Sequence, residues 1–557
     1  MAEKKELSAG KRLRRFLIGS SRDPEDKTLF HKLSLIAFFA WVALGADGMS
    51  SSSYGPEEAF RALSGHPTLS LFVALGSALT IFIISTSYNQ IIELFPSGGG
   101  GYLVASKLLS PKAGMVAGCA LLIDYVLTIT LSVASGADAL FSFLPAEWYP
   151  FRLEFAISVL LLLIILNLRG VKESVMLLVP IFLVFILTHI VLIGYAWGTN
   201  LFNLPTIISE TRVDFNNSVS ELGMFGVLFL ILKAYSMGAG TFTGIEAVSN
   251  GLPILREPKV ETAKRTMRYM AISLAFLVLG LMFSYLLYEV QPQHGKTLNA
   301  ILFQSITAQW GNNWGYYFVL IALLSEAALL TVAAQTGFID GPRVLSNMAL
   351  DRWMPTRFAT LSDRLVTQNG IIIMGVAAFI LMVSTQGSVQ FMVVLYSINV
   401  FITFVLSQLG MVRHWWFERK QEKHWRKKLF INGVGLILTS FILVSVIVLK
   451  FFEGGWITLI VTGGLIAFVL FVKKHYRSTL KLLKRLDTLV NVVEESDKVL
   501  TPEDIRNPKP EILFNKKAKT AVILVNGFNG LGLHTLFSVI RYFGDVYKNY
   551  LFLNRIN

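Results

Sequence analysis

Long apolar segments, separated by short polar stretches, run through most of this chain. A transmembrane α-helix needs about 20 consecutive, predominantly apolar residues, and segments of about that length recur between residues 30 and 474. The pattern predicts an all-α membrane protein with twelve transmembrane helices, near residues 30–64, 68–95, 113–143, 153–167, 173–197, 223–252, 267–289, 316–340, 369–385, 389–411, 430–449 and 455–474.

Small and polar residues interrupt two of the twelve segments. The first interruption runs from Leu44 to Glu58 and combines glycines and four serines with Asp47, and the second runs from Met237 to Ala247 and contains Glu246. Non-helical backbone at membrane depth is tolerated only where it is buried in protein or lines a cavity. A carboxylate at that depth indicates a functional site. We therefore expect two broken helices, with Asp47 beside a cation path.

The two interrupted segments are the first and the sixth, so they are five apart. Paired interruptions at corresponding positions indicate a transporter built from two repeats, with its binding site near the midplane. With a cytoplasmic N-terminus, the first span rises and the sixth descends. The sequence therefore predicts a five-plus-five inverted repeat followed by two further helices.

The net charge of +14 follows the predicted topology. Basic residues crowd into the loops of one side, whereas the opposite loops hold only Arg61, Arg152, Arg212, Lys296 and Lys450. Cytoplasmic loops carry an excess of Lys and Arg, so both termini are predicted to be cytoplasmic and no nucleic acid polymer is expected as a partner. Residues 1–29 form a basic arm, which we expect to lie against anionic lipid.

The composition changes after the last apolar segment. Residues 475–557 are predicted to form a cytosolic segment with an amphipathic helix near 476–494, strands at 521–525 and 550–553, and a helix at 533–543. This order is typical of the start of an α/β domain, which either continues beyond residue 557 or completes its sheet with a second copy. The glycine-rich turn at 526–532 is either a phosphate cradle or an ordinary strand-to-helix turn.

The first interruption favours a cation over an anion. The C-terminal end of a half-helix carries unpaired carbonyls and a negative dipole end, and Asp47 adds a formal charge there. The alternative is that Asp47 only caps the second half-helix. Glu246 is predicted to exchange a proton against a cation, because burial favours its neutral form and a nearby cation its charged form. The alternative for Glu246 is a buried carboxylic acid paired with another polar side chain, such as Lys233 on the same span.

The third segment supplies neutral oxygens. Tyr125, Thr128 and Ser132 fall on one helix face, and such oxygens suit a weakly held cation. The alternative is hydrogen bonding between helices, which is common for Ser and Thr in membranes. Glu326 and Asp340 in the eighth segment are weaker candidates, because no helix break accompanies them.

These features resemble the amino acid–polyamine–organocation superfamily with its LeuT-like fold, and more narrowly the KimA-type potassium importers, which are similar to the KUP potassium–proton symporters. The resemblance is carried by residues 45–58, 96–102 and 240–246. It implies a homodimer formed through the C-terminal segment, a possible nucleotide regulator there, and ion binding or proton coupling by Asp47, Tyr54, Tyr125, Thr128, Ser132, Thr243, Glu246 and Tyr396. Within that set it implies that potassium contacts Tyr54, Thr128, Ser132 and Thr243, and that Asp47 and Glu246 couple protons.

Other functional classes fit less well. The chain contains no HExxH or GxSxG motif and only one cysteine, Cys119, so we expect neither an enzyme nor a thiolate metal cluster. The closest alternative is an amino-acid permease of the same fold, against which Asp47 argues. A channel and a sensor with a transporter-like core are the others. We expect potassium import by alternating access, driven by proton symport, with potassium as the substrate and no cofactor.

Overall fold

The computed structural model describes most of the chain, namely residues 35–63, 65–98, 100–169, 175–200, 204–311, 313–362, 366–490, 515, 518–525 and 529–554. These residues separate into two compact units, which meet between Phe468 and Val469 and are described one at a time. The basic arm at 1–29, the polar stretch at 501–504 and residues 526–528 of the glycine-rich turn lie outside the described residues.

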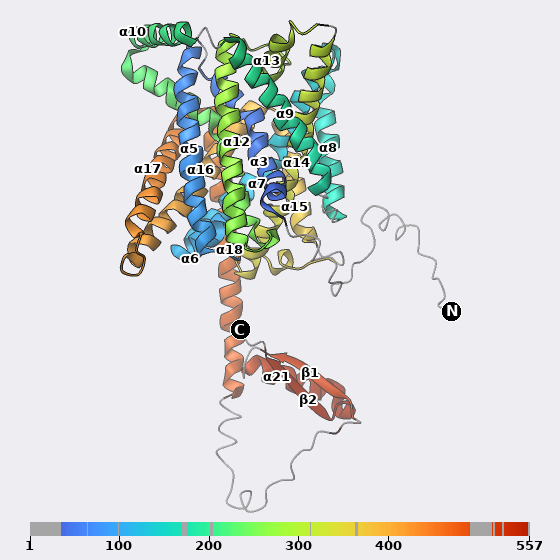
Figure 1. Cartoon of the computed structure of the whole chain (residues 1–557). Helices are drawn as coiled ribbons and strands as arrows, with labels where there is room; N and C mark the ends of the chain where they lie inside the picture. Colours follow the sequence, from blue (N-terminus) through green and yellow to red (C-terminus); the bar gives the residue numbers. More distant parts are fainter. Residues whose placement is uncertain are drawn as a thin grey trace, which may run out of the picture. The chain divides into compact units, whose positions relative to one another are not determined.

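The first unit is a helical bundle (Figure 1). Its long helices are α5 (Ser70–Leu94), α7 (Pro111–Phe141), α8 (Arg152–Leu168), α9 (Val175–Asn200), α10 (Leu204–Met237), α12 (Lys259–Leu287), α14 (Trp314–Leu350), α15 (Gln368–Ser384), α16 (Val389–Phe417), α17 (Trp425–Lys450) and α18 (Trp456–Leu483). The shorter ones are α3 (Ala37–Ser50), α4 (Gly55–Arg61), α6 (Gly101–Leu108), α11 (Ala247–Asn250) and α13 (Leu298–Thr307).

The twelve predicted spans all correspond to helices. Among the described residues, nine helices are long and apolar enough to cross a membrane. One of these, Trp425–Val490, contains both α17 and α18, while α15 has 17 residues and the first span is divided between α3 and α4. Counting α17 and α18 separately and adding α15 and the divided first span gives twelve. The chain is a multi-pass membrane protein.

Several helix boundaries differ from the prediction. The short helices α6 and α13 lie in connections that the hydrophobic pattern left as loops. Helix α10 starts at Leu204 and kinks at Gly223, so the sixth span has an additional helix before it. The predicted amphipathic helix at 476–494 is the continuation of α18, which ends at Leu483. These helices continue into segments rich in polar residues, and the hydrophobic pattern of the sequence does not detect such segments as parts of a span.

Helix α7 lies amid the other helices in Figure 1 and forms the centre of the bundle. Of its most apolar window, 83% is buried, against 22% for the helix that contains α8. It packs on α14, α16 and α6. A helix that is apolar all round and buried all round belongs to a core, so polar side chains on α7 point at neighbouring helices rather than at lipid.

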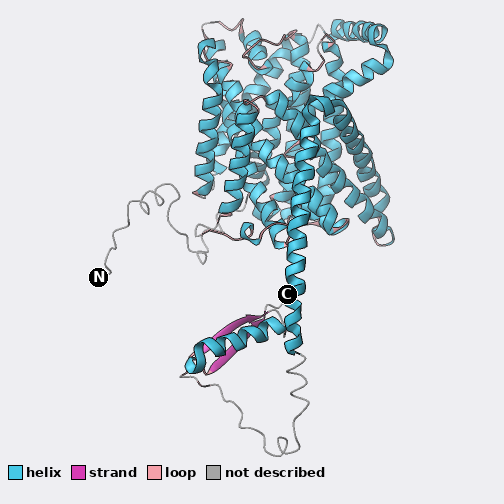
Figure 2. Cartoon of the chain, turned by 180° about the vertical axis from the view of Figure 1, so that it is seen from behind, coloured by secondary structure: helices cyan, strands magenta, loops and turns pink. Residues whose placement is uncertain are grey.

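The second unit contains a βαβ arrangement. Strand β1 (Thr520–Val525) pairs in parallel with β2 (Asn549–Asn554), with Thr520 opposite Asn549, and α21 (Gly530–Phe543) connects them. Figure 2 shows that these are the two strands among the described residues. Both predicted strands and the predicted helix are therefore present. The N–H groups of Gly530 and Gly532 already donate to Asp487 and Asn529, so a phosphate at this helix start would have to displace those side chains.

Candidate functional site

The two interruptions cross in direct contact. The first span changes from α3 through a 3₁₀ turn (Ser51–Ser53) to α4, and the sixth changes from α10 through Gly238–Phe242 to α11. Gly244 has a φ of +79°, and a Cβ there would lie 2.5 Å from the backbone nitrogen of Gly48. A Cβ on Gly55 would overlap the hydroxyl of Thr241. Glycine is required at these positions because the two backbones approach so closely.

The serines of the first break satisfy the end of α3. Three consecutive hydroxyls each donate to the carbonyl three residues earlier: Ser50 to Asp47 at 2.7 Å, Ser51 to Gly48 at 2.6 Å and Ser52 to Met49 at 2.7 Å. The expectation that these carbonyls are unpaired is therefore wrong, since local serine hydroxyls bond to them. The negative character of this break comes mainly from the Asp47 carboxylate.

Asp47 lies in the last turn of α3 and is buried. The N-cap of α4 is Tyr54, without a side-chain cap, so Asp47 does not cap the second half-helix as the alternative had it. No described residue donates a hydrogen bond to its carboxylate. Two other carboxylates lie close enough for their charges to act on Asp47. Glu246 directly precedes α11, and Asp340 belongs to α14.

Hydroxyl groups from four spans meet beside Asp47. The hydroxyls of Thr128 and Tyr396 lie 3.1 Å apart, and the Tyr54 hydroxyl is within hydrogen-bonding reach of Thr243 and Tyr396. All four side chains are buried. Thr243 also donates to the carbonyl of Gly240 at 2.8 Å. These four residues are called the hydroxyl cluster below.

Two predicted oxygens lie outside that cluster. The Tyr125 hydroxyl accepts a hydrogen bond from Asn250 at 3.2 Å, which links α7 to the end of α11. Ser132 is buried one turn beyond Thr128 on the same helix, and no hydrogen bond among the described residues joins it to the cluster. Tertiary packing thus selects one of the three hydroxyls on the predicted α7 face.

Glu246 does not pair with Lys233. The Lys233 ammonium lies 2.8 Å from Glu453 instead, so the suggested pair with Lys233 is wrong. The backbone N–H groups of Gly244 and Glu246 face its carboxylate, while its second oxygen is buried without a partner. A carboxylate stabilised only by backbone amides keeps the capacity to take up a proton or a cation.

The sequence analysis assigned no role to Asp124, which belongs to the same group of carboxylates. It is 2% exposed, and its Oδ1 atom has no hydrogen-bond partner. The charges of Glu246 and Asp47 act on it. An ionisable residue within an apolar span was the available signal, but only the fold shows that it faces the two breaks.

Lys450 is a second residue whose role the sequence did not indicate. It was expected in a loop, but its side chain is fully buried at the end of α17. Its ammonium donates to the carbonyl of Ser236, just before the sixth break, at 2.8 Å and to the hydroxyl of Ser397 at 3.0 Å. Ser397 adjoins Tyr396 of the hydroxyl cluster, so Lys450 fastens the sixth break to α16.

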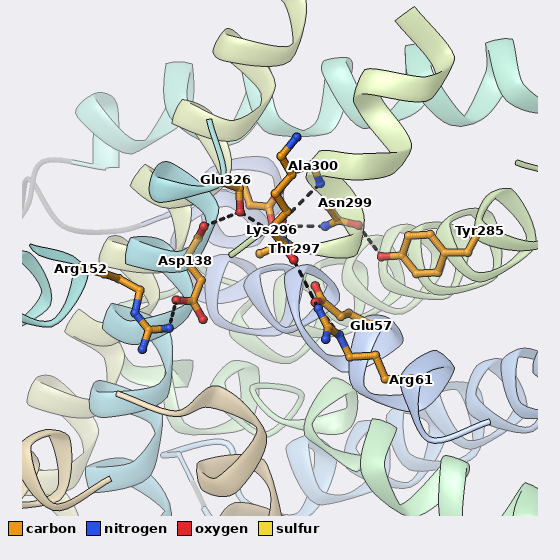
Figure 3. Close-up of polar contacts among 11 residues, drawn as sticks. Glu57, Arg61, Asp138, Arg152, Tyr285, Lys296, Thr297, Asn299, Ala300 and Glu326 are labelled. Atoms are coloured by element: carbon orange, nitrogen blue, oxygen red, sulfur yellow. Dashed lines mark hydrogen bonds and ion pairs between the residues drawn. The ribbon is translucent and has the colours of Figure 1, made fainter. Parts of the chain in front are cut away.

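One side of the hydroxyl cluster opens into a polar cavity of about 320 Å³. Tyr54, Glu58 and Ser135 line it together with residues of the segments before α8, α13 and α16. Figure 3 shows part of its surroundings, including the pairs Glu57–Arg61 and Asp138–Arg152. We call it the outer cavity.

The opposite side is closed by a hydrogen-bonded network. Arg343 donates to the Asp340 carboxylate at 3.2 Å and to the carbonyl of Asn250 at 3.4 Å, and Asn250 in turn donates to Tyr125. The glycine-rich turn after α5 packs against it, since a Cβ on Gly100 would overlap the Asn250 amide. This contact joins the turn to the end of α11.

Comparisons with known proteins identify the family of the chain. A family model described as amino acid permease matches residues 33–472. The potassium transporter KimA of Bacillus subtilis is 33% identical over 483 residues, which cover 85% of this chain and 76% of KimA. The low-affinity putrescine importer PlaP of Escherichia coli is 23% identical over 222 residues, 38% of this chain and 44% of PlaP. The match to a crystal structure of a mutant manganese transporter from Eremococcus coleocola covers 82% of this chain and 97% of the transporter chain. The sequence identity is 14% and the TM-score is 0.42.

Proposed function

The chain belongs to the amino acid permease family, and we propose that within it this protein imports potassium in symport with protons. The carrying observation is the hydroxyl cluster beside Asp47 at the crossing of the two breaks. Neutral oxygens replace the hydration shell of a monovalent cation, and a nearby carboxylate supplies the charge. The potassium transporter KimA among the relatives supports the choice of ion.

An amino acid fits this site less well. The carboxylate of an amino acid would need free backbone amides at a half-helix start. At the sixth break, the amides of Gly244 and Glu246 face the carboxylate of Glu246 itself. With Asp47 and Asp124 also buried nearby, a substrate carboxylate would be repelled.

Proton coupling is proposed to use Asp47 and Glu246. Both are buried. In the proposed symport, one of them carries a proton while potassium is bound beside the other, and both ions leave on the cytoplasmic side. The outer cavity and the Asn250–Arg343 network lie on opposite sides of the cluster, which supports alternating access between them.

The remaining expectations stay proposals. We place both termini in the cytoplasm, because the basic loops lie on their side, and the outer cavity then faces outward. We propose that the second unit contributes to a homodimer, because a two-stranded sheet is too small to be stable alone and Leu524 is 81% exposed on it. Anionic lipid remains the proposed partner of residues 1–29. A nucleotide at the second unit remains a proposal, one that requires displacement of Asp487.

The test is rescue of a potassium-uptake-deficient bacterium at micromolar potassium, with uptake of radiolabelled amino acids and putrescine measured in the same cells. We expect growth with the full chain and loss of growth with Asp47→Asn, which removes the charge beside the hydroxyl cluster. Ser85→Ala, on α5 and not in the lining of the outer cavity, serves as the control and retains growth. Entry of amino acids without potassium would overturn the proposal.

A further inference from the structure

The outer cavity contains one carboxylate without an ion-pair partner. Its other two carboxylates are paired, Glu57 with Arg61 at 2.7 Å and Asp138 with Arg152 at 2.5 Å. The remaining cation is Lys296, whose ammonium bonds to Gln304 at 2.9 Å.

The unpaired carboxylate is Glu58, one turn from Tyr54 on α4, where its N–H donates to the Tyr54 carbonyl. The charges of Arg61 and Lys450 act on Glu58 from a distance. Arg61, however, pairs with Glu57, and the hydrogen bonds of Lys450 go to Ser236 and Ser397. No cation among the described residues therefore contacts Glu58.

Three buried oxygens of the cavity lining, on Ser53, Glu58 and Ser135, have no hydrogen-bond partner among the described residues. Glu58 and Ser135 are each 5% exposed, and the Glu58 Oε2 and Ser135 Oγ atoms find no donor or acceptor. Burying a polar atom without a partner costs about 1–3 kcal/mol, so such atoms call for a ligand or a water. Ser53 adds a third oxygen to the lining, beside Glu326. All of these groups are oxygens, and no side-chain N–H among the described residues donates a hydrogen bond to them.

We propose that Glu58, Ser135 and Ser53 form a second cation site at the floor of the outer cavity, separated by Tyr54 from the other three hydroxyls of the cluster. One uncompensated carboxylate with neutral hydroxyls suits a monovalent cation, whereas a calcium site uses six to eight oxygens with several carboxylates. The identity of the ion as potassium rests on the proposed function. The ion exchanges water for protein oxygens at this site. It then passes Tyr54.

Such a site lowers the potassium concentration needed for uptake and leaves the translocation step to the hydroxyl cluster. We expect Glu58→Gln and Ser135→Ala to raise the KM for potassium by roughly tenfold or more, which corresponds to about 1.4 kcal/mol, with kcat within a factor of about two. Ser85→Ala is the matched control, because its hydroxyl is also buried and unpartnered but lies on α5, outside the cavity. Its KM stays at the wild-type value. The assay is uptake into proteoliposomes by the purified full chain.

Equilibrium binding of radioactive rubidium to the same proteins separates the two sites. Thr243→Val removes a hydroxyl of the cluster, and Glu58→Gln removes the carboxylate of the outer site. Each variant is expected to lose one bound ion per chain, and the double variant to lose both. Unchanged binding and KM in Glu58→Gln, alongside loss in Thr243→Val, would mean that water fills the floor and would overturn the outer site alone. If the wild type binds no alkali cation, the proposed function fails as well.

Discussion

At the scale of single residues, Lys450 shows the largest difference between the environment expected from the sequence and the environment in the fold. It follows an apolar run and precedes Phe451–Gly455, a pattern typical of a loop boundary. The fold instead buries its ammonium between Ser236 and Ser397. A buried charge is tolerated when hydrogen bonds satisfy it, and here they join the sixth break to the helix that holds Tyr396.

We expect Lys450→Met to destabilise the protein by about 1–3 kcal/mol, because the methionine keeps the volume but leaves the two acceptors without their charged donor. The KM for potassium should rise as Tyr396 loses its support. Thermal unfolding in detergent and uptake kinetics measure the two effects. The control is Lys233→Met, since the pair of Lys233 with Glu453 is over one-third exposed and such pairs contribute about 0–1 kcal/mol. Equal effects of the two variants would contradict a special role for Lys450.

Glu246 carries the prediction for proton coupling. Glu246→Gln keeps the shape and the facing backbone amides but cannot release a proton, so uptake driven by a pH gradient should be abolished. The measurement is potassium uptake into proteoliposomes with an imposed pH gradient. Glu93→Gln is the control, because Glu93 is partly exposed and pairs with Lys264. Unchanged pH-driven uptake in Glu246→Gln would make Glu246 structural.

At the scale of elements, the two breaks act as one unit because their backbones touch. The serines close the end of α3 with their own hydroxyls, and Ser51 also donates to the Thr241 carbonyl of the sixth break at 3.1 Å. This contact fixes where Tyr54 and Thr243 meet. The close approach depends on Gly244, whose positive φ few other residues adopt.

Gly244→Ala is therefore expected to destabilise the protein by about 1–3 kcal/mol through overpacking, in addition to the cost of a positive φ. Potassium uptake should fall with it, since the added Cβ would meet the Gly48 backbone. Gly194→Ala on α9 is the matched control, because a Cβ there meets nothing within 4 Å. Thermal unfolding of both purified variants checks the difference, and a Gly244→Ala variant as stable as Gly194→Ala would refute the close crossing.

At the scale of the whole molecule, the orientation can be tested with single cysteines. The native Cys119 is buried, so it gives a low background for thiol labelling. Glu147 precedes α8 beside the outer cavity and Lys420 precedes α17 among basic residues, and both are exposed. A membrane-impermeant thiol reagent should label Glu147→Cys in intact cells and Lys420→Cys only after permeabilisation. The reverse pattern would invert the proposed topology.

The sequence by itself determined the membrane class, the twelve helical spans, the two breaks and the βαβ start of the second unit. These follow from local properties: the length of an apolar run, the presence of glycines and serines within it, and the β-branched composition of a strand. Asp47 and Glu246 could be singled out because charged groups within apolar spans are rare, and Thr128 because it shares a helix face with Tyr125 and Ser132. Tyr54, Thr243 and Tyr396 were implied only by the family resemblance.

Only the tertiary structure decided which of those groups meet. Thr128 and Tyr396 are 268 positions apart, and no periodicity relates residues at that distance. The same reason explains why Lys233 was assigned the wrong partner, why Ser132 falls outside the cluster, and why Asp124, Lys450 and Glu58 gained roles. Each depends on which face of one helix packs against another, and helix packing is set by the whole bundle.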